Sequence, residues 1–168
     1  MKRIGIIILI LLIAVGVTAW LNREDLEERQ RSQEDAILLV TYGGEEMEVT
    51  FDDILVLPRV EFDAVLRTSA RPPVDTSYTG VEMSQLLEAA GVDLDAVNQV
   101  VTRAVDGYTV ALTGEEVRMA DNVYIVYERY GEDLGTREDG GSGPYQMVIR
   151  EDEFGQRWNK FLMRIEVE

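Results

Sequence analysis

The sequence contains neither cysteine nor histidine among its 168 residues. The chain can therefore form no disulfide bond, and it has neither a thiolate nor an imidazole to attack a substrate, relay a proton or bind a transition metal. Ser-His-Asp and Cys-His catalytic arrangements are excluded for the same reason. In an oxidising compartment, the core of such a protein must be stable without disulfide bonds.

Positive charge is also scarce, with 16 basic residues against 32 acidic ones and a formal net charge of −16 at pH 7. Lys2 and Lys160 are the only lysines, so arginine supplies nearly all of the positive charge. An acidic surface repels nucleic-acid phosphates, and we expect no nucleic-acid partner. The acidity suits a soluble surface, and it leaves the binding of a cation or a basic partner open.

Residues 4–21 carry no charge, and Thr18 is the only clearly polar residue among them. As a helix rising 1.5 Å per residue, this run reaches about 27 Å, which is close to the thickness of a bilayer core. Lys2 and Arg3 precede the run and favour a cytoplasmic amino terminus, with Trp20 at the membrane interface. We expect a single-pass anchor in the cell membrane, with the C-terminal domain extracytoplasmic.

The alternative is a cleaved signal peptide, because residues 17–19 offer a peptidase site of the expected kind. We favour the anchor, since the apolar run is longer than the core of a usual signal peptide. No cysteine follows the run, which excludes lipidation there, and Lys2-Arg3 is not a twin-arginine pair. Both alternatives place the rest of the chain outside the cytoplasm.

The composition divides the chain into three parts. Residues 1–21 form the anchor or signal peptide, residues 22–35 a charged stalk, and residues 36–168 one folded domain. The stalk holds six acidic residues, three arginines and Leu26 as its only apolar residue, so it has no face to bury. The third part is long enough for a single hydrophobic core.

Alternating hydrophobicity predicts strands through most of the domain. We expect a hairpin over residues 37–51, and further strands over residues 60–66, 97–105, 108–112, 123–127, 145–149 and 158–167. Asp106-Gly107 is the pair that best suits a tight hairpin turn. On the last strand, alternation places four residues on one side: Phe161, Met163, Ile165 and Val167.

Two helices are predicted from capping signals. Thr79 and Glu82 have the spacing of a capping box, and Gly91 suits the end of the helix that follows. Thr113 and Glu116 repeat the spacing before a shorter helix. The apolar stripe of the first helix consists of Met83, Leu86, Leu87 and Ala90.

Proline marks the remaining breaks in regular structure. Residues 52–57 are predicted to make a short turn that Pro58 ends, and residues 67–77, with Pro72-Pro73, are predicted to form a loop. Together these patterns indicate an α+β fold with a predominantly β core.

An ordered set of short segments resembles a known family. The segments are Tyr78-Thr79-Gly80-Val81, Leu86-Leu87, Ala90-Gly91-Val92, Asp106-Gly107-Tyr108, Gly143-Pro144, Lys160-Phe161-Leu162 and Ile165-Glu166. In this order they are similar to the molybdopterin-binding domain of the sulfite oxidase family, over roughly residues 51–168. The resemblance implies a mixed-sheet α+β domain. In relatives, this domain cradles a pterin-bound molybdenum and oxidises or reduces small oxyanions or sulfoxides.

The chain departs from this family at the metal ligand. Relatives supply a cysteine thiolate from the segment that corresponds to residues 67–71, and here Ser69 stands in that position. No soft ligand is available, so we expect no bound metal and no redox catalysis. A serine oxygen binds molybdenum in an unrelated enzyme family, so molybdopterin held through Ser69 or through the pterin alone stays open. Gln146 is neutral where relatives commonly place a basic residue near the cofactor.

The resemblance also suggests which residues line the binding site. Lys160 matches the lysine that reaches the pterin from the final strand in relatives. Arg67 and Arg71 could line the same cleft and would favour an anionic ligand. Tyr108 and Ser69 complete the candidate set, although Tyr108 also suits an ordinary strand position. The alternative for the three basic residues is that they are ordinary surface charges.

We therefore expect a membrane-tethered, extracytoplasmic binding or accessory domain that keeps the scaffold of the family without its redox centre. Relatives that work outside the cytoplasm normally receive the cofactor inside and cross the membrane folded, by the twin-arginine route, whose signal this chain lacks. Its expected partners are the membrane and either a small anionic ligand or a protein of a membrane complex. The rival interpretation is a molybdopterin-dependent oxidoreductase component.

Overall fold

The computed structural model describes residues 11–18, 35–68 and 71–168. Residues 11–18 are helical. No helix within these described ranges has both the length and the apolar character that a membrane span requires. Of the predicted stalk, only Asp35 lies within the described residues. The membrane anchor and the stalk therefore stay predictions from the sequence.

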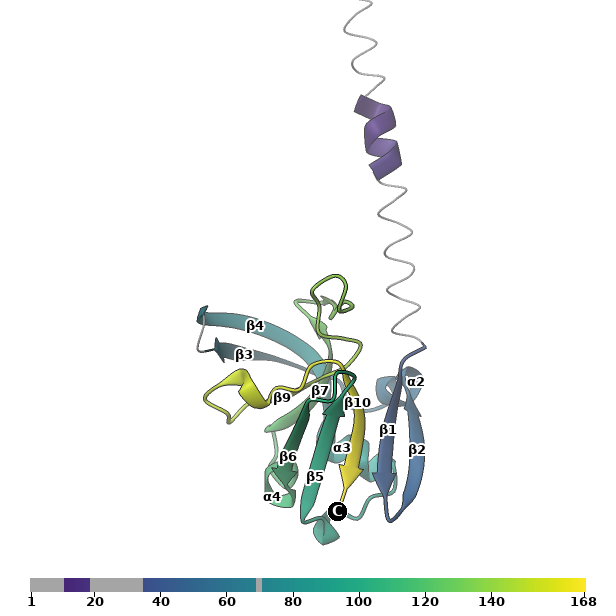
Figure 1. Cartoon of the computed structure of the whole chain (residues 1–168), viewed down its shortest axis with the longest axis vertical. Helices are drawn as coiled ribbons and strands as arrows, with labels where there is room; N and C mark the ends of the chain where they lie inside the picture. The colour runs from purple at the N-terminus through teal and green to yellow at the C-terminus, as the bar shows by residue number, and fades with distance from the viewer. Residues whose placement is uncertain (1–10, 19–34, 69–70) are drawn as a thin grey trace, which may run out of the picture.

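Within residues 35–68 and 71–168, the chain folds into two five-stranded sheets (Figure 1). The first sheet has the strand order β2-β1-β10-β5-β6, in which only β1 and β10 are parallel. Its strands are β1 (Ile37–Tyr42), β2 (Glu45–Thr50), β5 (Gln99–Ala104), β6 (Thr109–Thr113) and β10 (Leu162–Val167). The first and last strands of the domain thus lie side by side at its centre.

The second sheet is antiparallel and has the order β3-β4-β7-β8, with β9 also paired to β7. Its strands are β3 (Val60–Thr68), β4 (Arg71–Glu82), β7 (Val123–Arg129), β8 (Glu132–Asp133) and β9 (Gln146–Ile149). The β3–β4 hairpin extends from the body of the domain (Figure 1). The mixed, β-rich α+β class predicted from the sequence is confirmed.

Short helical segments connect the strands: α2 (Phe51–Leu55), α3 (Met83–Ala89), α4 (Gly114–Arg118) and the 3-10 turns η1 (Leu94–Ala96) and η2 (Gly155–Arg157). The predicted apolar stripe of α3 is buried at Met83, Leu86 and Leu87, and this face packs against β4 and β7. Gly91 ends the helix with a φ of +82°, as its predicted role requires.

The two capping predictions have different outcomes. At α4, the backbone N–H of Glu116 donates to Thr113 Oγ1 over 3.2 Å, and the backbone N–H of Thr113 donates to Glu116 Oε2 over 2.8 Å. That capping box is confirmed. The one predicted for α3 is wrong, because Thr79 belongs to β4 and the N-cap is Glu82, which makes no side-chain capping bond.

The core fills the space between the sheets and the short helices. Residues 123–127 of β7 are all buried, because the strand lies within the second sheet and is covered on both faces. Aromatic contacts reinforce this centre, with ring centroids 4.2 Å apart for Phe62 and Tyr124 and 5.4 Å apart for Phe51 and Tyr127. Each large buried apolar side chain stabilises the fold by roughly 1.5–3 kcal/mol relative to its exposed state.

The predicted loop over residues 67–77 is wrong, since β4 begins at Arg71 and continues through Pro72 and Pro73. The pairing of β3 with β4 shifts register between Leu66 and Thr68. Among the described strands, β7 joins the other edge of β4 only from Tyr78 onward. The prolines therefore lie where the ladder is irregular on one side and absent on the other, and their missing N–H groups disrupt little.

The predicted face of the last strand is wrong at its first half. Leu162 is buried and Met163 is exposed, whereas Ile165 and Val167 are buried as expected. The pairing of β10 with β5 shifts register between Leu162 and Arg164, and Phe161 has a left-handed φ of +54°. Such an irregularity exchanges the two faces of a strand, which strict alternation in the sequence does not reveal.

Candidate functional site

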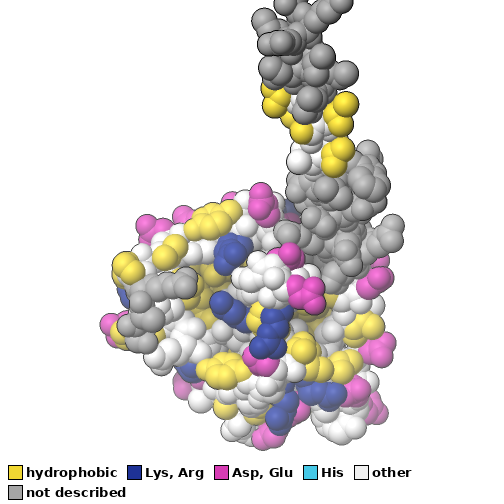
Figure 2. Space-filling view, turned by 45° about the horizontal axis from the view of Figure 1, so that its top comes forward, with side chains coloured by type: hydrophobic (Ala, Val, Ile, Leu, Met, Phe, Trp, Pro, Cys, Tyr) yellow, Lys and Arg dark blue, Asp and Glu magenta, His cyan; other side chains and the backbone are white. Residues whose placement is uncertain are grey.

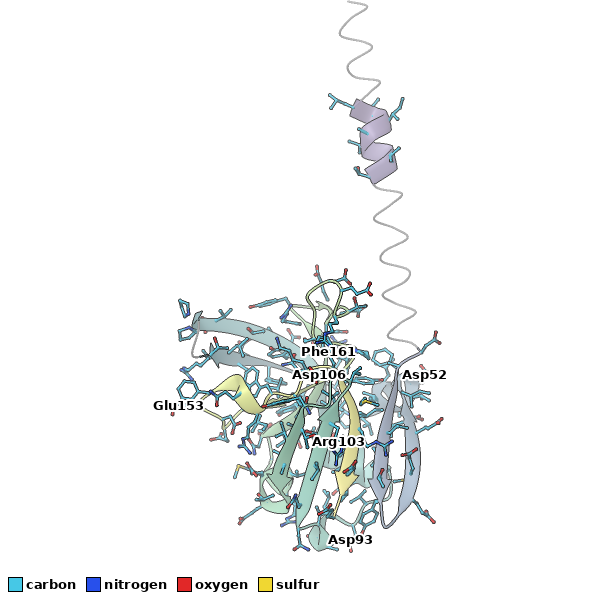
Figure 3. All side chains as sticks on the ribbon, viewed as in Figure 1. Asp52, Asp93, Arg103, Asp106, Glu153 and Phe161 are labelled. Atoms are coloured by element: carbon cyan, nitrogen blue, oxygen red, sulfur yellow. The ribbon has the colours of Figure 1, made fainter. Side chains whose placement is uncertain are left out.

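A hollow of about 220 Å³ opens where the turn between β5 and β6 meets the segment that leads into β10. We call it the strand-end hollow. Figure 3 shows two of its residues, Asp106 and Phe161, close together at the upper ends of these strands. Its lining consists of Asp106, Tyr108, Trp158, Asn159, Lys160 and Phe161.

Hydrogen bonds join the two walls of the strand-end hollow. The backbone N–H of Val105 donates to the carbonyl of Phe161 over 3.0 Å. The hydroxyl of Tyr108 donates to the carbonyl of Gln156 over 2.7 Å, and Asn159 Nδ2 approaches the carbonyl of Tyr108 at 3.5 Å. The hollow is therefore bounded by two segments that hold each other in place.

The sequence of the β5–β6 turn explains its shape. Gly107 has a φ of +84°, which glycine adopts at little cost, and this confirms the predicted turn. Asp106 Oδ1 accepts a hydrogen bond of 3.0 Å from the backbone N–H of Tyr108, so the aspartate closes its own turn. This local structure brings the side chains of Asp106 and Tyr108 to the edge of the hollow.

Asn159 is the buried polar residue of the hollow, with an exposed fraction of 0%. Its Nδ2 donates to Thr102 Oγ1 over 3.2 Å. Thr102 Oγ1 in turn donates to the carbonyl of Val110, and the carbonyl of Tyr108 can only accept. These acceptors fix the amide with its nitrogen toward them, and Asn159 Oδ1 is left without a partner among the described residues. A buried acceptor in this state favours a hydrogen bond from a buried water molecule.

A second hollow, of about 210 Å³, lies between β3 and the segment before β10. We call it the hairpin hollow. Trp158 lines both hollows, and its Nε1 donates to the carbonyl of Ile149 over 3.0 Å. The other lining residues are Asp63, Ala64, Val65, Arg67, Arg150 and Asp152.

The charges of the hairpin hollow are partly engaged within the protein. Arg157 makes ion pairs with Asp152 and with Glu116, at 2.8 Å in the second case, and hydrogen bonding to Asp152 raises the pKa of Arg157. The guanidinium of Arg150 lies 5.4 Å from the ring centroid of Phe62. Arg67 is exposed and makes no ion pair within the described part of the chain.

The structure brings part of the predicted site together. Lys160 and Tyr108 line the strand-end hollow, and Arg67 lines the neighbouring hairpin hollow. Ser69 lies outside the described residues, and Arg71 begins β4 without a described side chain. In Figure 2, dark blue basic side chains gather near the middle of the visible face, among yellow apolar ones.

Sequence reasoning missed most of the residues that line the two hollows, among them Asp106, Arg150, Trp158 and Asn159. Asp106 was interpreted only as a turn residue, and Trp158 only as part of a strand. The available signal was adjacency, since Trp158 and Asn159 directly precede Lys160 in the sequence. Nothing in the sequence placed Arg150 beside β3, because that contact joins segments that lie far apart in the chain.

Comparison with known proteins identifies the family and supports the fold. A model of the oxidoreductase molybdopterin binding domain family matches residues 39–168. Among solved structures, the chain is similar to the sulfane dehydrogenase SoxCD from Paracoccus pantotrophus, with a TM-score of 0.65 and 21% sequence identity. That match covers 81% of this chain but 39% of the SoxCD chain, so this chain spans less than half the length of that relative. No curated protein matches. The predicted resemblance is confirmed, and the chain belongs to the oxidoreductase molybdopterin binding domain family.

Proposed function

We propose that this protein is a membrane-tethered, extracytoplasmic binding domain that accepts a small anionic ligand in the strand-end hollow and catalyses no redox reaction. The observation that carries the proposal is the position of Lys160. Its ammonium group makes no ion pair with any described residue, although acidic residues outnumber basic ones two to one. A free cation at the edge of a hollow favours an anion there.

The donor set supports the absence of a molybdenum centre. The sequence has no cysteine or histidine, and the described residues contain no cluster of three or more carboxylates that could hold a metal ion. Gln146, near which relatives commonly carry a basic residue, is buried in β9. The residues present therefore do not fit a thiolate-bound molybdenum.

The rival function is an oxidoreductase component that holds molybdopterin through Ser69 or through the pterin alone, and family membership favours it. Metal analysis and pterin fluorescence of the protein purified from its native host distinguish the two. Our proposal expects neither molybdenum nor pterin in stoichiometric amount. Bound molybdenum together with turnover of sulfite or a sulfoxide would overturn it.

Anion binding can be tested directly on the full-length chain in a nonionic detergent. We expect saturable binding of sulfate or phosphate in calorimetric titrations, and loss of that binding in Lys160→Met. Arg103→Met is the matched control, because Arg103 lies on β5, outside the lining of the hollow, and is paired with Glu166 at 2.8 Å. Figure 3 labels Arg103 together with Asp106 and Phe161 of the hollow. The control variant removes one positive charge that does not line the strand-end hollow. Equal loss in both variants would indicate a general charge effect and contradict a site at Lys160.

The tether is tested by fractionation of the native host. We expect the intact protein in the membrane fraction, resistant to alkaline extraction, and accessible to protease added outside the cytoplasmic membrane. Removal of residues 1–21 is expected to abolish this retention. A mature protein that begins after residue 19 would instead support the signal-peptide alternative.

A further inference from the structure

The strand-end hollow carries one charge of each sign. Lys160 and Asp106 both line it, yet no ion pair joins them or links either to another described residue. We infer that the ligand of this hollow is a small zwitterion, with its anionic group on Lys160 and a protonated amine on Asp106. This inference rests on the proposed function and narrows its ligand class.

The carboxylate of Asp106 can accept further hydrogen bonds. One carboxylate oxygen, Oδ1, accepts the turn-closing bond from the backbone N–H of Tyr108, and an ionised carboxylate offers further acceptor positions. A simple anion next to Lys160 would gain nothing from this carboxylate and would be repelled by it. A ligand that also carries an ammonium group converts the repulsion into a charge-assisted hydrogen bond.

Asn159 lies on the other wall, next to Lys160 in the sequence, and its side-chain oxygen has almost no contact with solvent. Its amide is oriented by Thr102 and by the carbonyl of Tyr108, so the group without a partner is the carbonyl oxygen Oδ1. An ammonium group has three N–H donors and no acceptor, which suits the carboxylate of Asp106 on the β5–β6 turn. The opposite side offers Lys160, which can only donate. The two segments that bound the hollow thus supply one anionic acceptor, Asp106, and one cationic donor, Lys160.

The size of the hollow restricts the ligand further. A volume of about 220 Å³ equals that of about seven water molecules in the liquid. It lies below the range of roughly 300–1,000 Å³ that is usual for drug-sized ligands. A molecule such as an α-amino acid or O-phosphoethanolamine is of the right order. The shared chemistry is an anionic group and a primary ammonium a few bonds apart, supplied either by a free metabolite or by the headgroup of an aminophospholipid.

The test compares four probes on the full-length chain in a nonionic detergent: O-phosphoethanolamine, glycine, inorganic phosphate and ethanolamine. We expect at least one zwitterion to bind about tenfold more tightly than phosphate or ethanolamine, as one extra charge-assisted hydrogen bond would give. Preference for O-phosphoethanolamine over glycine, together with binding to phosphatidylethanolamine vesicles, identifies the headgroup as the source. Preference for glycine identifies a free amino acid, and equal binding of the two supports the shared chemistry alone.

The variant Asp106→Asn provides a second test of the same inference. It keeps the turn-closing acceptor and removes the charge, so we expect weaker zwitterion binding and equal or tighter phosphate binding. Wild-type protein that binds phosphate as well as either zwitterion overturns this inference and leaves the proposed function intact. Binding of none of the four probes overturns both. The wild-type comparison needs no variant, so a folding defect in Asp106→Asn does not remove the test.

Discussion

Tyr108 and Gln156 join the two walls of the strand-end hollow through one hydrogen bond, in which the phenol hydroxyl donates to the backbone carbonyl over 2.7 Å. Tyr108→Phe removes only this bond. Because Tyr108 is 48% exposed, water can replace part of the interaction, and we expect a loss of about 0.5 kcal/mol in the free energy of unfolding. We also expect several-fold weaker ligand binding, since the wall segments lose a restraint. Urea denaturation and calorimetric titration measure the two effects.

Tyr130→Phe is the matched control for this prediction. The hydroxyl of Tyr130 also donates to a backbone carbonyl, that of Asp75, and the side chain is 61% exposed. Tyr130 does not line the strand-end hollow. We expect a similar small loss of stability without a change in ligand affinity. If Tyr130→Phe weakened binding as much as Tyr108→Phe does, the bond to Gln156 would have no special role.

Glu116 makes the stability of the domain depend on pH. Burial acts to raise its pKa, but hydrogen bonds from Thr113 and Arg157 outweigh this, and the pKa lies below the usual 4.5. A lowered pKa in the folded state contributes stability that is complete above the unfolded pKa, and that is lost as the pH falls through the folded pKa. We expect Glu116→Gln to cost about 1 kcal/mol at pH 7, because the site is only partly exposed, and progressively less below about pH 4.

Urea denaturation across the range from neutral pH to about pH 3 tests this dependence. Glu115→Gln removes the exposed neighbouring carboxylate, which accepts no capping bond, and we expect little effect at any pH. A stability difference between wild type and Glu116→Gln that stayed constant down to the lowest pH would contradict a role for the ionised carboxylate.

The sequence correctly predicted those turns and helix caps that depend only on residues close together in the chain. The Asp106-Gly107 turn and the Thr113–Glu116 capping box depend on residues that are neighbours in the chain, and both were predicted correctly. The face of β10 was predicted incorrectly, because the register shift before Arg164 depends on pairing with β5, about 60 residues earlier. The strand through Pro72-Pro73 was missed because pairing with β3, over many residues, outweighs the local tendency of proline to end a strand.

The candidate site likewise combines residues that the sequence identified with features that depend on contacts between distant segments. Lys160 and Tyr108 were selected from the resemblance to the family, and they do line one hollow. The burial of Asn159 and the missing partner of its Oδ1 depend on Thr102 and Tyr108, which belong to a different segment. No pattern around residue 159 reports such a contact, so this buried polar group could be identified only from the structure.

Gly80 is required by a close approach of two backbones. A Cβ atom at this position would lie 2.3 Å from the carbonyl oxygen of Ile125 on β7, and backbone atoms cannot move aside easily. A Cβ at Gly155 would meet Leu66 Cδ1 at 2.5 Å, and that atom ends a side chain that can change rotamer. We expect Gly80→Ala to cost about 2–3 kcal/mol, and Gly155→Ala about 1 kcal/mol.

Thermal and urea denaturation of the two alanine variants measure which substitution costs more stability. Equal costs would show that the β4–β7 pair can separate as easily as Leu66 can turn, which would contradict the tight pairing of these strands. Because Leu66 lies on β3 and Gly155 on η2, Gly155→Ala is also expected to alter the hairpin hollow. A change in the fluorescence of Trp158, which lines that hollow, would report it.

Thr102 holds the side-chain amide of Asn159 in place through a hydrogen bond. Its hydroxyl is fully buried, accepts from Asn159 Nδ2 over 3.2 Å and donates to the carbonyl of Val110 over 3.4 Å. Thr102→Val keeps the shape but leaves Asn159 Nδ2 with only the 3.5 Å contact to Tyr108, in addition to the unpartnered Oδ1. We expect a loss of about 1–3 kcal/mol, the usual cost of a buried polar group that has lost its partner.

The double variant Thr102→Val, Asn159→Leu separates this cost from a packing effect. When both partners become apolar with similar shape, no polar group is left buried without a bond, and most of the lost stability should return. Thr76→Val is the control, because the Thr76 hydroxyl reaches only the carbonyl of Val74, two residues away. A double variant less stable than Thr102→Val alone would show that Asn159 packs favourably without its bond to Thr102.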